Sequence, residues 1–352
     1  MLSVLVVAAR ALNATRKNLR HRWRRMRVVR GAIQQSVRVA RQLTWYQPPG
    51  EQRRCPACAA ARLKYMMPLA YAAPPVAYGW RYGFVCGCRR CGLLFSNPLP
   101  DEQQLSKMYS PEGAWGAGRQ EATEPSVNRK RLEDLFAPVR SDIDVLHPLP
   151  GASVLDFGCG AGGMLDALQE VGWETHGFEP ATRTAFARHR EITALPDEPQ
   201  FDLVVVHHVL EHVRNPLDIL RRLARAMREG AYMLISVPDL DDVAQHGDFE
   251  YVLRSKTHVL AYGTASVTWL TAAAGLRVVS SRRSEGSRRR VVLARRERHA
   301  IDPPAAPLKA AQSALGLYFV RFPHERPSFQ RVPVRLRAAL CNLQRDARHA
   351  TD

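Results

Sequence analysis

The sequence predicts an α/β fold built on a doubly wound, mainly parallel sheet. An apolar run at 154–157 leads into a loop with four glycines in six residues, and residues 164–168 then carry apolar side chains at helical spacing. A further predicted strand, 175–179, ends in a carboxylate, and 201–206 is a fully apolar strand. Strands that alternate with helices in this order form parallel sheets.

The glycine loop is the first candidate binding element. Gly158, Gly160 and Gly162 follow Asp156 in the pattern D-x-G-x-G-x-G, and the same stretch also fits the dinucleotide pattern G-x-G-x-x-G. Glycines let a backbone turn sharply and approach a ligand, with the N–H groups of a helix start facing it. Glu179 lies where a doubly wound sheet places an acid on ribose hydroxyls. Together these residues predict a nucleoside ligand without naming it.

The stretch 201–216, FDLVVVHHVLEHVRNP, decides between the two patterns. With it, the chain resembles the class I S-adenosylmethionine-dependent methyltransferases, which carry a D-x-G-C-G-x-G loop, an acid closing the next strand, and FDLV…LEHV…P. The resemblance runs from about Val154 to Val292. It implies a Rossmann-like, seven-stranded methyltransferase sheet with a closing antiparallel hairpin, and S-adenosylmethionine (SAM) as cofactor. The cofactor-binding residues that it implies are Asp156, Gly158, Cys159, Gly160, Gly162, Glu179, Asp197 and His207.

Three histidines are candidate bases. Methyl transfer to oxygen needs an acceptor held in line with the methyl group and a residue that takes its proton. His258 is the first candidate, since it follows the predicted strand 232–238, where related sugar C-methyltransferases place a histidine in a Y-x-E-H context. This chain has R-S-K-T-H there instead, which favours O-methylation over C-methylation. His208 and His212 are second candidates: a helix beginning near His208 would put Glu211 and His212 on one face. The alternative is that Glu211 and His212 only orient the loop.

Two C-x-x-C pairs, separated by 29 residues, predict a structural zinc site. Four thiolates at this spacing surround one tetrahedral Zn²⁺ and leave no open position. Disulfide bonds are the alternative, disfavoured in a chain that we expect to be cytoplasmic. The predicted ligands are Cys55, Cys58, Cys88 and Cys91, with Cys86 as a spare for Cys88. The stretch 91–100, CGLLFSNPLP, resembles the zinc-ribbon prefix of some bacterial methyltransferase domains, which covers the substrate side of the cofactor cleft.

Charge is unevenly distributed along the chain. The formal net charge is +18, yet residues 1–54 hold 13 basic and one acidic side chain, whereas residues 151–275 hold 10 basic and 17 acidic ones. An acidic core argues against nucleic acid as a partner, because phosphate contacts dominate such binding. Apolar residues every seven positions from Leu5 to Ile33 predict a basic amphipathic helix. Peripheral contact of residues 1–46 with an anionic membrane is one interpretation. Most basic helical faces are only solvated, which favours the alternatives, a helix packed on the protein or a poorly ordered extension.

The sequence predicts five parts. No stretch approaches 18 uninterrupted apolar residues, and the N-terminus lacks the leading basic cluster of a secretory signal, so we expect a cytoplasmic protein. Contact with the inner face of the membrane is expected only if the membrane interpretation of residues 1–46 holds. The parts are a basic helical extension (1–50), a zinc-ribbon-like module (51–100), a helical linker that covers the substrate (101–150), the methyltransferase domain (151–298) and a basic C-terminal extension (299–352). Within the linker we expect helices at 102–109 and 127–146.

The predicted function is SAM-dependent methyl transfer to a sugar, a lipid-linked glycan or a small metabolite. An NAD(P)-dependent sugar-nucleotide enzyme would share the glycine loop, but we find no Tyr-x-x-x-Lys pair. A non-enzymatic scaffold that binds membranes or partners through its basic ends would need neither Asp156 nor Glu179. Both alternatives therefore explain less of the sequence.

Overall fold

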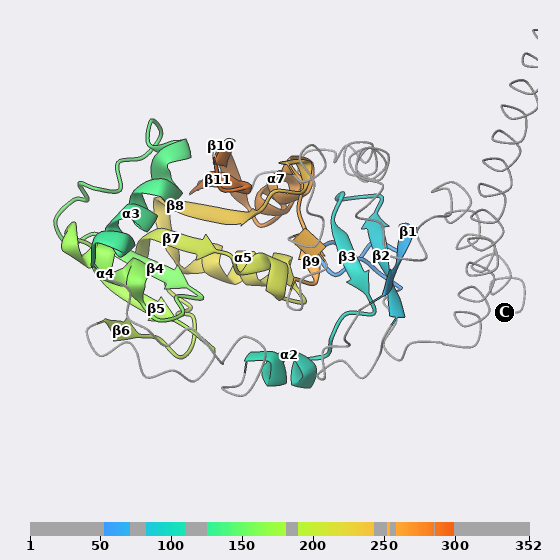
Figure 1. Cartoon of the computed structure of the whole chain (residues 1–352). Helices are drawn as coiled ribbons and strands as arrows, with labels where there is room; N and C mark the ends of the chain where they lie inside the picture. Colours follow the sequence, from blue (N-terminus) through green and yellow to red (C-terminus); the bar gives the residue numbers. More distant parts are fainter. Residues whose placement is uncertain are drawn as a thin grey trace, which may run out of the picture. The chain divides into compact units, whose positions relative to one another are not determined.

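A computed structural model describes seven stretches of the chain (Figure 1). They are 53–70, 82–109, 125–180, 189–242, 252–253, 258–284 and 286–298. The predicted amphipathic helix within residues 1–46 and the C-terminal extension from residue 299 lie outside these ranges. Within these ranges, none of the helices combines the length and the apolar character that a membrane span requires.

The larger sheet has seven strands. They are β4 (Ser153–Phe157), β5 (Glu174–Phe178), β6 (Arg190–Glu191), β7 (Phe201–His207), β8 (Met227–Pro238), β10 (Leu276–Ser284) and β11 (Arg289–Arg296). Their order is β10-β11-β8-β7-β4-β5-β6. Five neighbouring strands, β8, β7, β4, β5 and β6, run parallel to one another, and β11 is antiparallel to both of its neighbours. The carboxyl ends of β4, β5 and β7 therefore meet at one edge of the sheet, where α/β folds bind ligands.

Helices cover both faces of this sheet. They are α3 (Pro125–Phe136), α4 (Gly163–Glu170), α5 (Pro216–Ala226) and α7 (Thr264–Ala273), with 3₁₀ turns η1 (Ala137–Val139) and η2 (Leu210–His212); a further helix, α2 (Glu102–Tyr109), precedes α3 in the chain. Leu203 and Val205 of β7 pack in one core with α3 and α4, whereas Val204 and Val206 pack in a second core with α5 and α7. Successive strand side chains point to opposite faces, so a strand covered on both sides is apolar throughout.

A smaller antiparallel sheet carries the cysteine pairs. It consists of β1 (Leu63–Ala70), β2 (Tyr82–Cys88), β3 (Leu94–Asn97) and β9 (Leu260–Ala261), in the order β1-β2-β3-β9. β9 comes from the chain after β8 and pairs with β3, as can be followed in Figure 1. Leu93 and Phe95 belong to the same apolar core as α5 and α7. The cysteine-bearing segment is therefore packed directly on the larger sheet's helices.

The predicted Rossmann-like α/β fold with a mainly parallel sheet is confirmed. Two local predictions are corrected. The helix predicted within the linker at 127–146 ends at Phe136, because Pro138 lacks an N–H group and restricts the residue before it. The prediction of a helix beginning near His208 is wrong, because His208 has a left-handed backbone (φ +55°) and only the short turn η2 follows it. The division into five parts stays a prediction.

Candidate functional site

Strand β4 turns into α4 through a bend of left-handed glycines. Gly158, Gly160 and Gly162 have φ values of +83°, +57° and +82°. Other residues are strained in this conformation. At Gly158 space is also limiting, because a Cβ atom there would lie 2.5 Å from Cγ2 of Val209. The bend thus needs glycine for its conformation, and at Gly158 also for the close approach of the loop after β7.

We expect Gly158→Ala to be markedly more destabilising than Gly151→Ala. Gly151 has a similar φ of +75°, but a Cβ atom there would meet nothing within 4 Å, so this variant measures the backbone strain alone. The clash with Val209 should cost Gly158→Ala a further ~1–3 kcal/mol of unfolding free energy. Chemical denaturation of both variants measures the difference. Equal losses would show that the Val209 contact does not constrain the bend.

Glu179 faces this bend. Its Oε2 accepts a hydrogen bond from the N–H of Gly160 at 2.9 Å. The carbonyl oxygen of Phe178 accepts hydrogen bonds from the N–H groups of Gly158 (2.7 Å) and Cys159 (3.3 Å). The bend and the end of β5 are therefore tied together, and a carboxylate lies beside the glycine N–H groups. This is the arrangement in which an acid can reach the ribose of a nucleoside lying across the bend.

Asp156 is a buried carboxyl at the end of β4. Burial, and then the charge of Glu179, raise the pKa of Asp156 to about 7. The protonated form therefore stabilises the unliganded fold at acidic pH, and this stabilisation is lost as the pH rises through 7. A cation bound nearby would favour the ionised form instead. A cationic ligand held beside these carboxyls would therefore bind more tightly at higher pH.

The affinity for SAM should rise by up to about tenfold between pH 6 and pH 8, because binding a cation to a half-protonated Asp156 must release its proton. S-adenosylhomocysteine lacks the sulfonium charge and should show a smaller rise. Calorimetric titrations of both ligands across this range measure the effect. In Asp156→Asn the difference between the two ligands should disappear, and a difference that persists would assign the pH dependence to another group.

The other predicted cofactor-binding residues lie at different places. Cys159 is buried within the bend, with its Sγ 3.0 Å from where a Cβ atom on Gly177 would be. His207 ends β7, and its Nε2 lies 3.5 Å from a guanidinium nitrogen of Arg289. Burial, His208 and Arg289 hold the pKa of His207 well below its usual value, so the ring is neutral. Asp197 is exposed in the loop between β6 and β7.

Three histidines surround one buried carboxylate after β7. Glu211 is 0% exposed, and its Oε1 lies 2.8 Å from Nδ1 of His208 and 3.8 Å from Nε2 of His212. The rings of His212 and His258 meet edge to face at 4.8 Å. The structure thus brings all three predicted bases to one cluster. Glu211, His212 and His258 could also hold a divalent metal, since their donor atoms lie within 4.8 Å of one another.

The four predicted cysteine ligands converge. The Sγ atoms of Cys55 and Cys91 are 3.6 Å apart, and those of Cys58 and Cys88 are 3.5 Å apart. All four lie within 4.8 Å of one another. Ideal tetrahedral Zn–S bonds of about 2.3 Å would separate the sulfurs by about 3.8 Å, so the group fits a zinc ion. Cys86, the predicted spare, instead points to Asn97, whose Nδ2 lies 3.5 Å from its Sγ.

In each C-x-x-C pair, a backbone N–H donates a hydrogen bond to the sulfur of the first cysteine. The N–H of Ala57 donates to Sγ of Cys55 at 3.4 Å, and the N–H of Arg90 donates to Sγ of Cys88 at 3.3 Å. Such donors favour the thiolate form, in which a cysteine binds a metal. The donor set therefore suits a cation that binds thiolates.

Backbone contacts join the cysteine-bearing sheet to the histidine cluster. The N–H of Ser96, on β3, donates to the carbonyl of Val259, and the N–H of Val259 donates to the carbonyl of Glu211 at 2.8 Å. The hydroxyl of Tyr262 donates to the carbonyl of Leu210 at 3.0 Å. His258 immediately precedes Val259, so its position depends on the pairing of β3 with β9.

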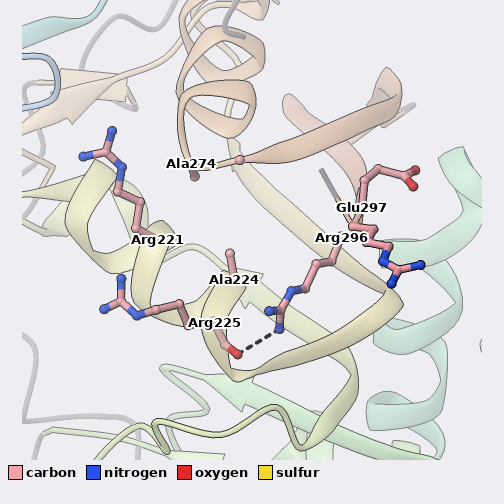
Figure 2. Close-up of a pocket in the computed structure, with 8 residues that line it drawn as sticks. Arg221, Ala224, Arg225, Ala274, Arg296 and Glu297 are labelled. Atoms are coloured by element: carbon pink, nitrogen blue, oxygen red, sulfur yellow. Dashed lines mark hydrogen bonds between the residues drawn. The ribbon is translucent and has the colours of Figure 1, made fainter. Parts of the chain in front are cut away.

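A pocket of about 220 Å³ lies at the other edge of the larger sheet, and Figure 2 shows its arginine-rich lining. Arg296 donates to the carbonyl of Arg225 at 2.9 Å, and Arg221 donates to the carbonyl of Ala273 at 3.4 Å. These carbonyls belong to the ends of α5 and α7, where cationic side chains satisfy unpaired backbone groups. The pocket therefore has a structural explanation and is separate from the glycine bend.

Sequence reasoning did not assign a site role to Glu211 or to Arg289. The motif LEHV contained Glu211, but its burial against three histidines depends on the return of the chain at His258. The contact of Arg289 with His207 joins β11 to β7 across β8. Neither contact has a local sequence signal.

Comparison with known proteins gives three findings. Residues 127–281 match the protein family described as "Methyltransferase domain". The ubiquinone biosynthesis O-methyltransferase of Paracidovorax citrulli is 33% identical over 111 residues, which cover 27% of this chain and 47% of that protein. The protein of the same name from Marinobacter nauticus is 26% identical over 160 residues, which cover 40% of this chain and 64% of that protein. The chain spans about half the length of the curated relatives that it matches.

Solved structures include the 1,6-didemethyltoxoflavin-N1-methyltransferase of Burkholderia thailandensis, with bound 1,6-didemethyltoxoflavin and S-adenosylhomocysteine. It is 19% identical, with a TM-score of 0.36, and the match covers 50% of this chain and 92% of that one. The mitomycin 7-O-methyltransferase MmcR is 22% identical, with a TM-score of 0.40, and the match covers 49% of this chain and 54% of that one.

Proposed function

We propose that this chain, whose residues 127–281 form a class I SAM-dependent methyltransferase domain, transfers the methyl group of SAM to a hydroxyl oxygen. The observation that most supports this proposal is the contact of Glu179 with the N–H of Gly160 across the glycine bend. It puts a carboxylate at the end of β5 directly beside the glycine bend, where a doubly wound sheet holds the ribose of a nucleoside.

The chain's own residues would act in three ways. SAM supplies a methyl group already activated by its sulfonium. Glu179 would hold the ribose hydroxyls, and the bend at Gly158–Gly162 would hold the methionine end beside Asp156. A histidine of the cluster after β7 would accept the proton of the acceptor hydroxyl, since oxygen must lose its proton as the new bond forms. The remaining contribution is orientation of the acceptor in line with the methyl group.

The acceptor class is a sugar, a lipid-linked glycan or a small metabolite with a hydroxyl group. Oxygen as the accepting atom is supported by the names of the relatives, which are O-methyltransferases. Peripheral membrane contact through residues 1–46 stays a prediction, since these residues lie outside the described ranges.

The experiment that tests this function is transfer of a labelled methyl group from SAM to panels of phenols, nucleotide sugars and lipid-linked glycans. We expect the labelled methyl group to appear on acceptors of one of these classes, with one molecule of S-adenosylhomocysteine formed for each methyl group transferred. Tight SAM binding without S-adenosylhomocysteine formation in any panel, or in an extract of small metabolites, would contradict the proposal.

We further propose that Cys55, Cys58, Cys88 and Cys91 hold one structural zinc ion. The proposal is supported by the sulfur separations of 3.5 and 3.6 Å and by the backbone N–H donors to two of the sulfurs. With four protein ligands the ion would have no open position, so its role would be to stabilise the small sheet.

A further inference from the structure

The two oxygens of the Glu211 carboxyl group have different surroundings. Oε1 lies 2.8 Å from Nδ1 of His208, a hydrogen bond that orients the group. Oε2 is buried and has no hydrogen-bond partner among the residues that the structure describes. Buried polar atoms in proteins are nearly always paired, so a buried oxygen without a partner calls for an explanation such as a bound ion.

Two imidazole rings lie beside this carboxyl group. Nε2 of His212 is 3.8 Å from Oε1 of Glu211, and the centroids of the His212 and His258 rings are 4.8 Å apart. One donor atom from each of the three side chains lies within 4.8 Å of the other two. Ligand atoms held at about 2.1 Å from one ion are about 3.0–3.5 Å apart. The separation of 3.8 Å is slightly longer, as expected before an ion draws its ligands together.

Backbone hydrogen bonds fix the positions of the three residues. The N–H of His212 donates to the carbonyl of Val209 at 2.9 Å, which closes the turn η2. The N–H of Val259 donates to the carbonyl of Glu211 at 2.8 Å, and this bond holds His258, the preceding residue, next to the turn. The main chain therefore brings the three side chains together without help from an ion, as a preorganised site requires.

The three donors form a set that is common in metalloproteins. Two imidazole nitrogens and one carboxylate oxygen bind Zn²⁺ or Fe²⁺ in sites that keep at least one position open. This differs from the four cysteines, which would fill every position around their ion. The site also adjoins the glycine bend, because Val209, in the same loop, packs against Gly158.

We propose that Glu211, His212 and His258 bind one divalent transition-metal ion, with a coordination position left for a water or hydroxyl oxygen. The ion would give Oε2 of Glu211 a partner. His208 is not one of the ligands: its hydrogen bond to Oε1 is the kind of outer contact that orients a carboxylate ligand. The inference concerns metal binding alone and does not depend on which acceptor is methylated.

The test is the binding of Co²⁺ to the full, untagged chain, first loaded with one equivalent of zinc to fill the four-cysteine site. Calorimetry gives the number of ions bound, and visible absorption identifies their ligands. We expect one Co²⁺ per chain, with the weak d–d bands of nitrogen and oxygen ligands and no sulfur-to-cobalt charge-transfer band. Thiolate ligands would produce that charge-transfer band.

Two variants remove different ligands of the proposed site. Glu211→Gln and His258→Gln should each weaken Co²⁺ binding by about 100-fold, since loss of an outer partner of a ligand already costs about 10–100-fold. The matched control is His147→Gln, because His147 lies 2.8 Å from Asp144 in an exposed histidine–carboxylate pair. Its affinity for Co²⁺ should stay within twofold of the native value. Thermal unfolding before cobalt is added should be the same in the native chain and the variants, which shows that the fold is intact.

Three results would each overturn the inference. They are no binding of Co²⁺ by the native chain, bound cobalt with the bands of thiolate ligands only, and native affinity in either Glu211→Gln or His258→Gln. None of these results bears on SAM binding or methyl transfer, which are measured separately.

Discussion

Glu179→Ala should weaken the binding of SAM by about 100-fold. The native carboxylate lies at the end of β5 and already accepts a hydrogen bond from the bend at Gly160. If it holds the ribose, the variant loses charge-assisted hydrogen bonds of ~1.5–3 kcal/mol each, and every 1.4 kcal/mol is about tenfold in affinity. Isothermal titration calorimetry with SAM measures the loss.

The matched control for this variant is Glu174→Ala. Glu174 is exposed at the first position of β5, so it removes the same charge from the same strand at the end away from the bend. Its affinity for SAM should stay within twofold of the native value. Equal losses in both variants would mean that overall charge, rather than contact with the ribose, explains the effect.

The double variant Cys58→Ser with Cys91→Ser should lose the zinc ion and unfold the small sheet. It removes one sulfur from each of the two close pairs. Structural zinc sites of this type supply ~10–16 kcal/mol of binding energy that is also folding energy, more than a small sheet can replace. Elemental analysis should find about one zinc per native chain and near zero in the variant, with lower thermal stability.

Unfolding of the small sheet should displace residues of the histidine cluster but leave the glycine bend in place. β3 holds β9 through Ser96 and Val259, next to His258, whereas the bend is tied to β5 by the hydrogen bonds of Gly158, Cys159 and Gly160 to Phe178 and Glu179. We therefore expect methyl transfer to fall while SAM still binds. Cys86→Ser is the control, because Cys86 is buried in the same sheet outside the four-sulfur group. A native chain that folds without zinc would refute the metal proposal.

The parts of the fold that were predictable depend on short-range patterns. Strand β7 is apolar at every core position because helices cover both faces, and its sequence shows this directly. The bend needs left-handed glycines within five residues, and Glu179 follows at the spacing of the next parallel strand. The first of these signals lies within one strand, and the other two lie within one strand–helix–strand unit, so the sequence alone located them.

The parts that were not predictable depend on contacts between distant segments. β9 has two residues and no pattern of its own, and it forms because β3 offers a free edge. The backbone of His208 reverses where a helix was predicted, since its N–H is held by Ser236 of β8 and the next residue, Val209, packs against Gly158 of the bend. The burial of Glu211 beside the histidines likewise emerges only when His258 returns to its side.

The central claim is that a SAM molecule lies across the Gly158–Gly162 bend with its ribose at Glu179. The most direct measurement is calorimetric titration of the native chain with SAM and, separately, with NAD⁺. The account predicts one SAM bound per chain and no heat of binding for NAD⁺ at the same concentrations. Tighter binding of NAD⁺ than of SAM, or no binding of SAM, would contradict it.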